Sequence, residues 1–354
     1  MKLWLFIGTY TSRGSAGIYR AAFDPHNERL ELHGVAAAEG NPSFLALSPC
    51  GRRLYAVCDL APQSPQPGAV AAYIVGPDGE LRLLNRVAMQ GARGCHIAVD
   101  RTGRVALVAN YAEGSVAAFP IREDGSLGER SDFHQHHGHG PNPRRQEKPH
   151  AHSVTISPDN RLAVVADLGT DRLMLYQLDA TRGRLLPHEP PSVAVHPGAG
   201  PRHFAFHPSG RWAYLVNELD STLTVFTYNA GRGTLCAIQT VSALPAGFRG
   251  ESIAADVHVA PSGRLVYCSN RGHDSIAIFA VDPESGLVSL AGHANTRGRT
   301  PRNFALTPDG EYLLVANQDT DNVVVFRVDQ VGGGLLPVAG EIPVSMPVCL
   351  VFAP

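Results

Sequence analysis

The stretch RHFAFHPSGRWAYLVN, residues 202–217, contains two short apolar segments on either side of the sequence Pro208-Ser209-Gly210-Arg211. In the first segment apolar and polar residues alternate, which is typical of a strand with one buried face. Proline presets the first position of a turn and glycine tolerates the left-handed conformation that a tight turn needs. The stretch therefore predicts two short strands joined by a tight turn.

The same pattern recurs along the chain, and the second strand of each copy ends in Asn or Asp. A further copy is split between the chain ends, because residues 348–354 match the first strand and residues 2–8 match the second. The six complete copies span residues 43–59, 95–110, 152–167, 202–217, 255–270 and 302–317.

Each copy continues into two further strands, and the copies recur at a spacing of roughly 50 residues, as in β-propellers. We therefore expect an all-β fold: a seven-bladed β-propeller with four antiparallel strands per blade. Residues 1–354 would form one domain, and the N- and C-terminal strands would together close the last blade. A solenoid is the competing architecture, but the split copy favours a closed ring.

The composition excludes several classes of protein. Among 354 residues, 32 are acidic and 30 basic, so the chain lacks the positive surplus that binding to nucleic acid or an anionic membrane requires. No apolar stretch is long enough to span a membrane, and the apolar run at residues 3–7 is too short for a signal peptide. The six cysteines are scattered, as in proteins of a reducing compartment, and we expect a cytoplasmic protein.

A comparison of equivalent positions in the seven copies indicates a functional site. In an up-and-down blade the start of the first strand and the end of the second lie on the same face of the ring. Six ionisable residues occupy these positions, where other copies have mostly neutral ones: His152, Arg202, His203, Glu218, Arg271 and Arg302. Such residues could simply pair with one another and face water, but six complementary charges in a narrow mouth favour a functional role.

Two long connections, residues 132–151 and 245–254, are expected on the same face, where long loops often act as lids. The second contributes Arg249 and Glu251. The first contains Arg145, His150 and a histidine cluster at residues 134–139. This cluster lacks the rigid framework and carboxylate partners of a dedicated metal site, so we expect adventitious metal binding there and no catalytic metal.

Four stretches of the sequence resemble the lactonase-type seven-bladed propeller family, and the resemblance covers essentially the whole chain. This family includes bacterial 6-phosphogluconolactonase of the propeller type and fungal carboxy-cis,cis-muconate cyclase. The stretches are Gly8-Thr9-Tyr10-Thr11, residues 108–116, the run from Gly140 to His152, and Gly200-Pro201-Arg202-His203 with Asn217-Glu218.

The resemblance implies a catalytic set of one histidine, two arginines and one glutamate, with no metal or organic cofactor. The matching positions are His152 or its neighbour His150, together with Arg202, Glu218 and Arg271. It implies a small-molecule lactone as the substrate, which could be phosphorylated, and no obligate protein partner. The remaining substrate-binding candidates are Arg145, His150, His203, Arg249, Arg302 and Gln318.

Opening a δ-lactone requires a base for water, a cation for the oxyanion and an acid for the ring oxygen. His152 or Glu218 suits the base, Arg271 or Arg202 the oxyanion, and Arg145, Arg249 and Arg302 a phosphate. We expect metal-independent hydrolysis of 6-phosphoglucono-δ-lactone, a step of the pentose phosphate pathway.

An unphosphorylated sugar-acid lactone, or a lactone-forming reaction of the muconate type, is the alternative. A non-catalytic binding platform is the third possibility, and it would present apolar patches where this sequence places charges. A serine hydrolase is disfavoured because the sequence has no G-x-S-x-G motif.

Overall fold

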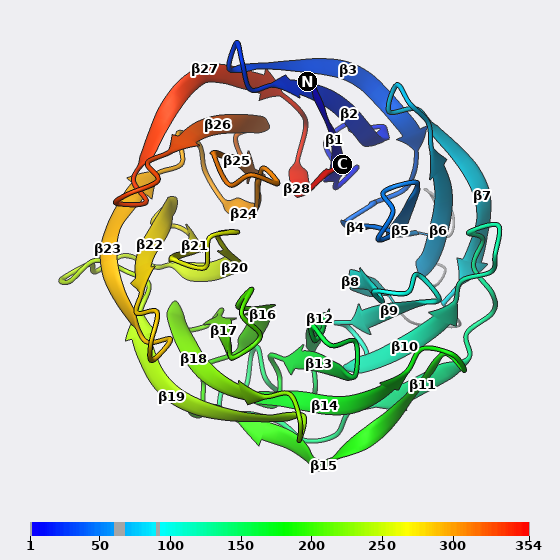
Figure 1. The fold of residues 1–354 in the computed structure, drawn as a ribbon, viewed down its shortest axis with the longest axis vertical. Coiled ribbons are helices and arrows are strands. Elements are labelled where there is room, and N and C mark those ends of the chain that lie inside the picture. The colour runs from blue at the N-terminus through cyan, green and yellow to red at the C-terminus, as the bar shows by residue number, and fades with distance from the viewer. Residues whose placement is uncertain (1, 60–67, 90–92, 354) are drawn as a thin grey trace.

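The computed structural model describes residues 2–59, 68–89 and 93–353, and every regular element in these ranges is a β-strand. The strands form seven four-stranded antiparallel sheets, arranged around a central axis as the blades of a ring (Figure 1). The predicted seven-bladed β-propeller is confirmed. No helix in the described ranges could cross a membrane.

Six sheets follow the chain in order, each from an inner strand at the axis to an outer strand at the rim (Figure 1). The first three contain β4 (Phe44–Leu47), β5 (Arg53–Asp59), β6 (Gly68–Val75) and β7 (Leu81–Ala88); β8 (Gly94–Val99), β9 (Val105–Asn110), β10 (Ser115–Pro120) and β11 (Asp132–Gln135); and β12 (Ala151–Ile156), β13 (Leu162–Asp167), β14 (Arg172–Asp179) and β15 (Arg184–Ala194).

The next three sheets repeat this arrangement. They contain β16 (Pro201–Phe206), β17 (Trp212–Asn217), β18 (Thr222–Asn229) and β19 (Thr234–Ser242); β20 (Ile253–Val259), β21 (Leu265–Arg271), β22 (Ser275–Val281) and β23 (Val288–Asn295); and β24 (Pro301–Leu306), β25 (Tyr312–Asn317), β26 (Asn322–Val328) and β27 (Leu335–Pro343).

The seventh sheet joins the two ends of the described chain. Its inner strand is β28 (Pro347–Phe352), followed outward by β1 (Leu3–Thr9), β2 (Gly17–Asp24) and β3 (Arg29–Ala38). β28 pairs antiparallel with β1, with Leu5 opposite Phe352 and Ile7 opposite Leu350. The predicted closure by the terminal strands is confirmed, and it gives the inner edge of β1 a partner strand.

The turns between the first and second strands have the conformation that their sequences predict. In the blade of β16 and β17, Gly210 donates to the carbonyl of His207 at 2.9 Å and has φ of 67°. Asn160 takes the equivalent position in the blade of β12 and β13, with φ of 60°. Asparagine is among the few residues with a side chain that adopt this region readily, so the turn is kept without glycine.

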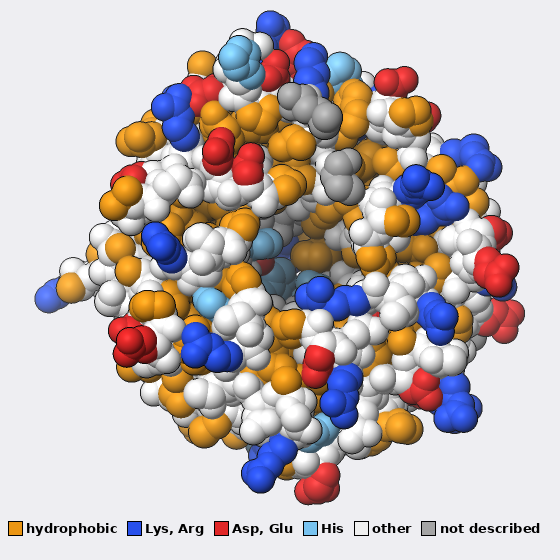
Figure 2. Space-filling model, viewed as in Figure 1, with side chains coloured by type: hydrophobic (Ala, Val, Ile, Leu, Met, Phe, Trp, Pro, Cys, Tyr) orange, Lys and Arg blue, Asp and Glu red, His pale blue; other side chains and the backbone are white. Residues whose placement is uncertain are grey.

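The hydrophobic core lies between neighbouring blades. Leu5 and Phe23 of the closing blade, for example, pack with Leu314 and Val325 of the blade before it, and all four side chains are buried. Each blade thus covers the apolar faces of its two neighbours. The central axis is not filled in this way, since Figure 2 shows that the face it views is hollowed at the centre, with histidine side chains visible inside.

Candidate active site

A β-bulge at the start of the inner strands places the candidate residues. In β12 the pairing shifts between Ala151 and Ser153, so that His152 is an extra, unpaired residue opposite β13. The same shift leaves Arg202 unpaired in β16 and Arg302 unpaired in β24. A bulge turns its extra side chain out of the regular alternation. This explains why equivalent positions in different blades converge at one mouth of the ring.

His152 and Arg302 line a cavity of about 420 Å³ at that mouth, whereas the expected catalytic residue Arg202 is fully buried and is not part of the cavity wall. The cavity is large enough for a small ligand, and its walls combine cationic, aromatic and apolar groups. Its lining residues are Tyr10, Arg93, Gly94, Cys95, Tyr111, Ala112, Arg145, His152, Glu218, Ile253, Arg271 and Arg302.

Glu218 is the centre of the charge arrangement. Its side chain is only 4% exposed, and its Oε2 accepts from Arg202 Nε at 2.9 Å and from Arg271 Nη2 at 3.0 Å. Its Oε1 accepts from Arg145 Nη2. One buried carboxylate therefore holds three guanidinium groups from three different segments of the chain.

The electrostatics keep Glu218 ionised. Burial would raise the pKa of this carboxyl group, but Arg271, Arg202 and Arg145 outweigh burial and lower it to about 2. Burial and the neighbouring Arg271 and Arg302 lower the pKa of Arg202 to about 9, which still leaves it charged at neutral pH. A carboxylate bound in this way is a weak base, so Glu218 is better suited to positioning the arginines than to activating water.

His152 is the better base. Burial, followed by the charges of Arg202, His203 and Arg302, lowers the pKa of His152 well below 6.5, so its ring is neutral. Its Nε2 lies 3.8 Å from Glu218 Oε2, and its buried Nδ1 has no hydrogen-bond partner. A neutral imidazole with a free nitrogen can accept a proton from water.

Arg271 supplies a second unused group. Its Nη2 donates to Glu218 and to the carbonyl of Ala254 at 3.0 Å, whereas its buried Nε has no partner. Arg271 lines the cavity, so its guanidinium group suits an oxygen atom that gains negative charge there, although Nε itself is enclosed by protein. Cys95 also lines the cavity, but burial raises the pKa of its thiol to about 12, so it is not a thiolate nucleophile.

Arg302 forms no hydrogen bond or ion pair with another described residue. Its guanidinium carbon lies 5.3 Å from the centre of the Tyr10 ring, in a cation–π arrangement, and both residues line the cavity. Arg93 adds a second cationic group to the cavity, from the blade of β8. The cavity therefore presents positive charge that is available to an anionic ligand.

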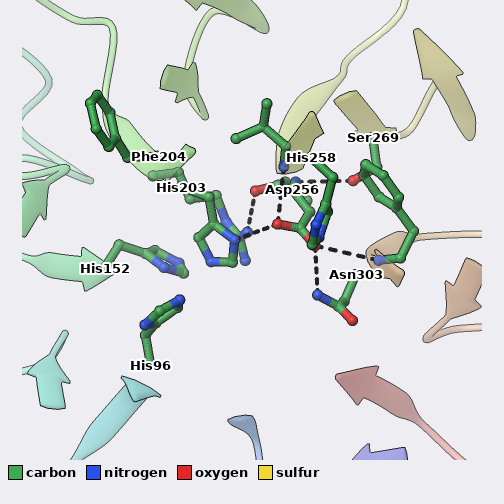
Figure 3. A network of polar contacts seen from close by, with 12 residues as sticks. His96, His152, His203, Phe204, Asp256, His258, Ser269 and Asn303 are labelled. Atoms are coloured by element: carbon green, nitrogen blue, oxygen red, sulfur yellow. Dashed lines mark hydrogen bonds and ion pairs between the residues drawn. The ribbon is translucent and has the colours of Figure 1, made fainter. Parts of the chain in front are cut away.

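Four of the expected substrate-binding residues are not in the cavity wall. His150 stacks on Tyr111, with ring centres 4.5 Å apart, and bonds to Glu147, so it supports the wall from behind. His203 lies deeper, against Asp256 in the central channel (Figure 3). Arg249 is exposed on its loop, and the Gln318 amide bonds to Asp319.

The histidines of residues 134–139 do not converge on one point. His136 is buried and bonds through Nδ1 to Asp167 at 2.6 Å, while His134 bonds to the carbonyl of Leu185 at 2.7 Å. His137 and His139 are exposed. In the described ranges no cluster of three or more His, Cys, Asp or Glu side chains could hold a metal ion.

The sequence comparison did not select Tyr10, Arg93, Tyr111 and Ile253 as site residues. Tyr10 and Tyr111 follow the second strand of their blades, and both occur in the stretches that carry the family resemblance, so that resemblance could have indicated them. Arg93 and Ile253 lie at the entry to inner strands, outside the compared positions. Nothing in the repeat pattern marks these two residues.

The fold and the site define this protein as a seven-bladed β-propeller with a charged cavity at one mouth of its ring. The comparisons with known proteins give its family. The family described as lactonase, 7-bladed beta-propeller, matches residues 4–352. The chain belongs to this family.

Named relatives resemble nearly the whole chain. It is 39% identical to the 6-phosphogluconolactonase of Bacillus subtilis over 348 residues, which is 98% of this chain and 97% of the relative. It is 34% identical to the 6-phosphogluconolactonase of Formosa agariphila, covering 96% of this chain and 97% of the relative. The solved structure of the periplasmic gluconolactonase of Pseudomonas aeruginosa superimposes with a TM-score of 0.93 at 34% identity, covering 100% of this chain and 99% of that one.

Proposed function

We propose that this protein hydrolyses a sugar-acid δ-lactone, with 6-phosphoglucono-δ-lactone as its substrate in the pentose phosphate pathway. The observation that carries the proposal is the cavity in which Glu218 holds three arginines beside the neutral His152. Such a site offers a base and several cations, which are the groups that ring opening of a lactone requires. The names of the Bacillus and Formosa relatives support the same reaction.

In the proposed mechanism His152 accepts a proton from water as the water oxygen attacks the lactone carbonyl carbon. The carbonyl oxygen becomes an oxyanion, which the guanidinium group of Arg271 in the cavity wall stabilises. The carbon–oxygen bond of the ring then breaks, and the His152 imidazolium returns its proton to the ring oxygen. Glu218 positions Arg202 and Arg271 for these steps.

The substrate's phosphate would bind at Arg302, and Arg93 is the second arginine of the cavity that is free to bind it. Neither guanidinium has a carboxylate partner in the described ranges, and both line the cavity. Arginine binds phosphate oxygens strongly because its planar group donates two parallel hydrogen bonds. Arg145, already bound to Glu218, would be a further phosphate ligand only if it exchanged partners.

An unphosphorylated aldonolactone is the second candidate, favoured by the name of the Pseudomonas gluconolactonase. A lactone-forming reaction on a muconate would use the same arginines for carboxylates. Two assays separate these functions: hydrolysis of freshly generated 6-phosphoglucono-δ-lactone and of glucono-δ-lactone, each corrected for spontaneous opening. Faster opening of the phosphorylated lactone supports the proposal, whereas acceleration of neither contradicts it.

We also propose a cytoplasmic location. All six cysteines are free, which suits a reducing compartment. The Pseudomonas relative is periplasmic by name, so fractionation of the source cells, with cytoplasmic and periplasmic marker enzymes measured in parallel, is the direct test.

A further inference from the structure

A buried network of polar side chains lies at the centre of the ring, between the inner strands (Figure 3). At its centre, Asp256 Oδ1 accepts from His203 Nδ1 at 2.6 Å, and Oδ2 accepts from His258 Nε2 at 3.0 Å. Oδ2 also accepts from Asn303 Nδ2 at 2.5 Å. Asp256 is only 3% exposed, and the proposed hydrolysis makes no use of it.

The network approaches the site through His203. The His203 ring lies edge-on to the His152 ring, with centres 5.5 Å apart, and to the His96 ring at 5.3 Å. The Nδ1 atom of His152 is buried and has no hydrogen-bond partner, and a buried polar atom of this kind commonly binds water. One bridging water could therefore connect His152 to His203.

The channel beyond the network is open. Inner-strand residues two positions after His96, Ser153, His203 and Asp256 face the same way, because side chains alternate along a strand. The residues at these later positions are Ala98, Thr155, Ala205 and His258. The first three are small, and each keeps part of its surface exposed. The fourth is His258, whose side chain is 39% exposed. Water thus reaches the network from the side away from the cavity.

Ring opening leaves a carboxylic acid, because His152 has returned its proton to the ring oxygen. At neutral pH the carboxyl O–H bond breaks, the now neutral His152 accepts this proton, and the proton must then leave the site. We propose that His203, held by Asp256, carries this proton from His152 through the central channel to the opposite mouth of the ring. The inference rests on the proposed function. It makes His203 a proton carrier, and it makes Asp256 a positioning residue that acts through His203.

The tautomer of His203 suits this role. The Asp256 carboxylate only accepts hydrogen bonds, so His203 Nδ1 carries the hydrogen and Nε2 has a free lone pair. Nε2 accepts a proton from the bridging water, where one O–H bond breaks as one N–H bond forms. The same N–H bond then breaks as the proton passes to water in the open half of the channel. No electrons are transferred, and His203 returns to its starting state.

The charges favour movement in this direction. Arg202 and Arg302 on the cavity side disfavour a proton on His152, whereas the ionised Asp256 attracts one toward the network. Burial and Arg202 lower the pKa of His203 to about 4 despite Asp256, so His203 releases a proton readily and stays neutral between turnovers. His258, on the other carboxylate oxygen, has its pKa raised above 6.5 by Asp256 against the effect of burial.

The test compares kcat of His203→Gln and Asp256→Asn with the wild type in weakly and strongly buffered solution. Glutamine cannot carry a proton, so in weak buffer we expect kcat of His203→Gln to fall roughly tenfold, with KM unchanged and full recovery when imidazole is added. Asp256→Asn should show a smaller loss with the same recovery. His188→Gln is the matched control, because His188 lies on the outer strand β15 and is 7% exposed, against 6% for His203.

Three outcomes contradict the inference. If both variants keep full kcat in weak buffer, no proton leaves through His203. If kcat falls but imidazole does not restore it, the network supports the fold only, and a lower melting temperature would show this directly. If the wild type opens no lactone, the proposed function fails and this inference with it, whereas failure in the variants alone leaves the lactonase proposal intact.

Discussion

His152 Nε2 lies 3.8 Å from Oε2 of Glu218, the same oxygen atom that Arg202 and Arg271 bind at 2.9 Å and 3.0 Å. The imidazole is thus the third neighbour of one carboxylate oxygen, at a distance too long for a hydrogen bond. The Glu218 carboxylate is already bound by arginines, whereas the His152 ring keeps a nitrogen atom without a hydrogen-bond partner. This difference separates the two groups that the sequence left as equal candidates for the base.

Replacing Glu218 with glutamine should abolish most of the activity and destabilise the protein. The amide cannot balance three guanidinium groups, and leaving buried charges without their partner costs about 3–5 kcal/mol. We expect kcat/KM to fall at least about 100-fold, since the arginines lose their positions. Steady-state kinetics and urea unfolding measure both effects.

The control is Glu147→Gln, because Glu147 is half exposed and contacts only His150 on the outside of the site. It should keep near-normal kinetics and stability. Full activity in the Glu218 variant would remove the central carboxylate from the proposed mechanism.

Stability should depend on acid through Glu218. Its pKa is about 2 in the folded protein against an ordinary 4.5, so the carboxylate stabilises the fold above pH 4.5, and this contribution is lost as the pH falls toward 2. The free energy of unfolding, measured by urea titration across this window, should fall more steeply with decreasing pH for the wild type than for Glu218→Gln. Parallel curves for the two proteins would contradict the assignment.

The pH profile of kcat should reflect the depressed pKa of His152. Because burial, Arg202 and the other neighbours lower this pKa well below 6.5, the neutral base persists as the solution becomes acidic. We therefore expect activity to stay level through pH 6.5 and to decline only at distinctly lower pH. A fall in kcat centred near pH 6.5 would contradict this expectation, because it would indicate a base whose pKa is that of an unperturbed histidine.

His152→Gln should lower kcat by about 10²–10⁴-fold, the range typical of a lost general base. His196→Gln, at a histidine paired with Asp220 on the surface, is the matched control and should be fully active. Equal kcat values for the wild type and the His152 variant would rule out the proposed base.

Arg302→Ala should distinguish phosphorylated from unphosphorylated substrates. Loss of one charge-assisted hydrogen bond to phosphate is expected to raise KM for 6-phosphoglucono-δ-lactone about 10–100-fold, with little change for glucono-δ-lactone. Arg249→Ala, at an exposed arginine outside the cavity wall, should leave both KM values unchanged. An equal rise for both lactones would place the phosphate elsewhere.

Chelation should leave the activity unchanged. The cavity is lined by four arginines besides one histidine and one carboxylate, and that carboxylate is already bound to two of them, Arg145 and Arg271, and to Arg202 behind them. A divalent cation would be repelled by this set of groups. Activity measured before and after EDTA treatment and dialysis tests this, and restoration of a lost activity by added metal would contradict it.

The sequence predicted the ring because each blade repeats the same turn and the same two strands. It also predicted Arg202, Glu218 and Arg271 together, since these residues depart from the repeat at equivalent positions. The pairing of Glu218 with Arg145 was beyond it, because Arg145 comes from a long loop without a repeat to compare. That loop is held by Gln146, whose amide donates to the Leu168 carbonyl and to Asp171.

His150 and His152 show a second limit. Two residues apart in a strand, they would face the same side under simple alternation. The bulge between Ala151 and Ser153 breaks this alternation and turns His152 alone toward the cavity. A one-residue shift in pairing depends on the neighbouring strand, and the local sequence does not reveal it.

The pairing of β28 with β1 also determines the order of events in synthesis. On the ribosome, β1 emerges with β2 and β3, but its partner β28 is made only after the six further blades. Through that time its inner edge carries backbone groups with no partner strand, and such an edge invites pairing with other chains. The nascent protein is therefore most exposed to aggregation at the blade that finally makes it a ring.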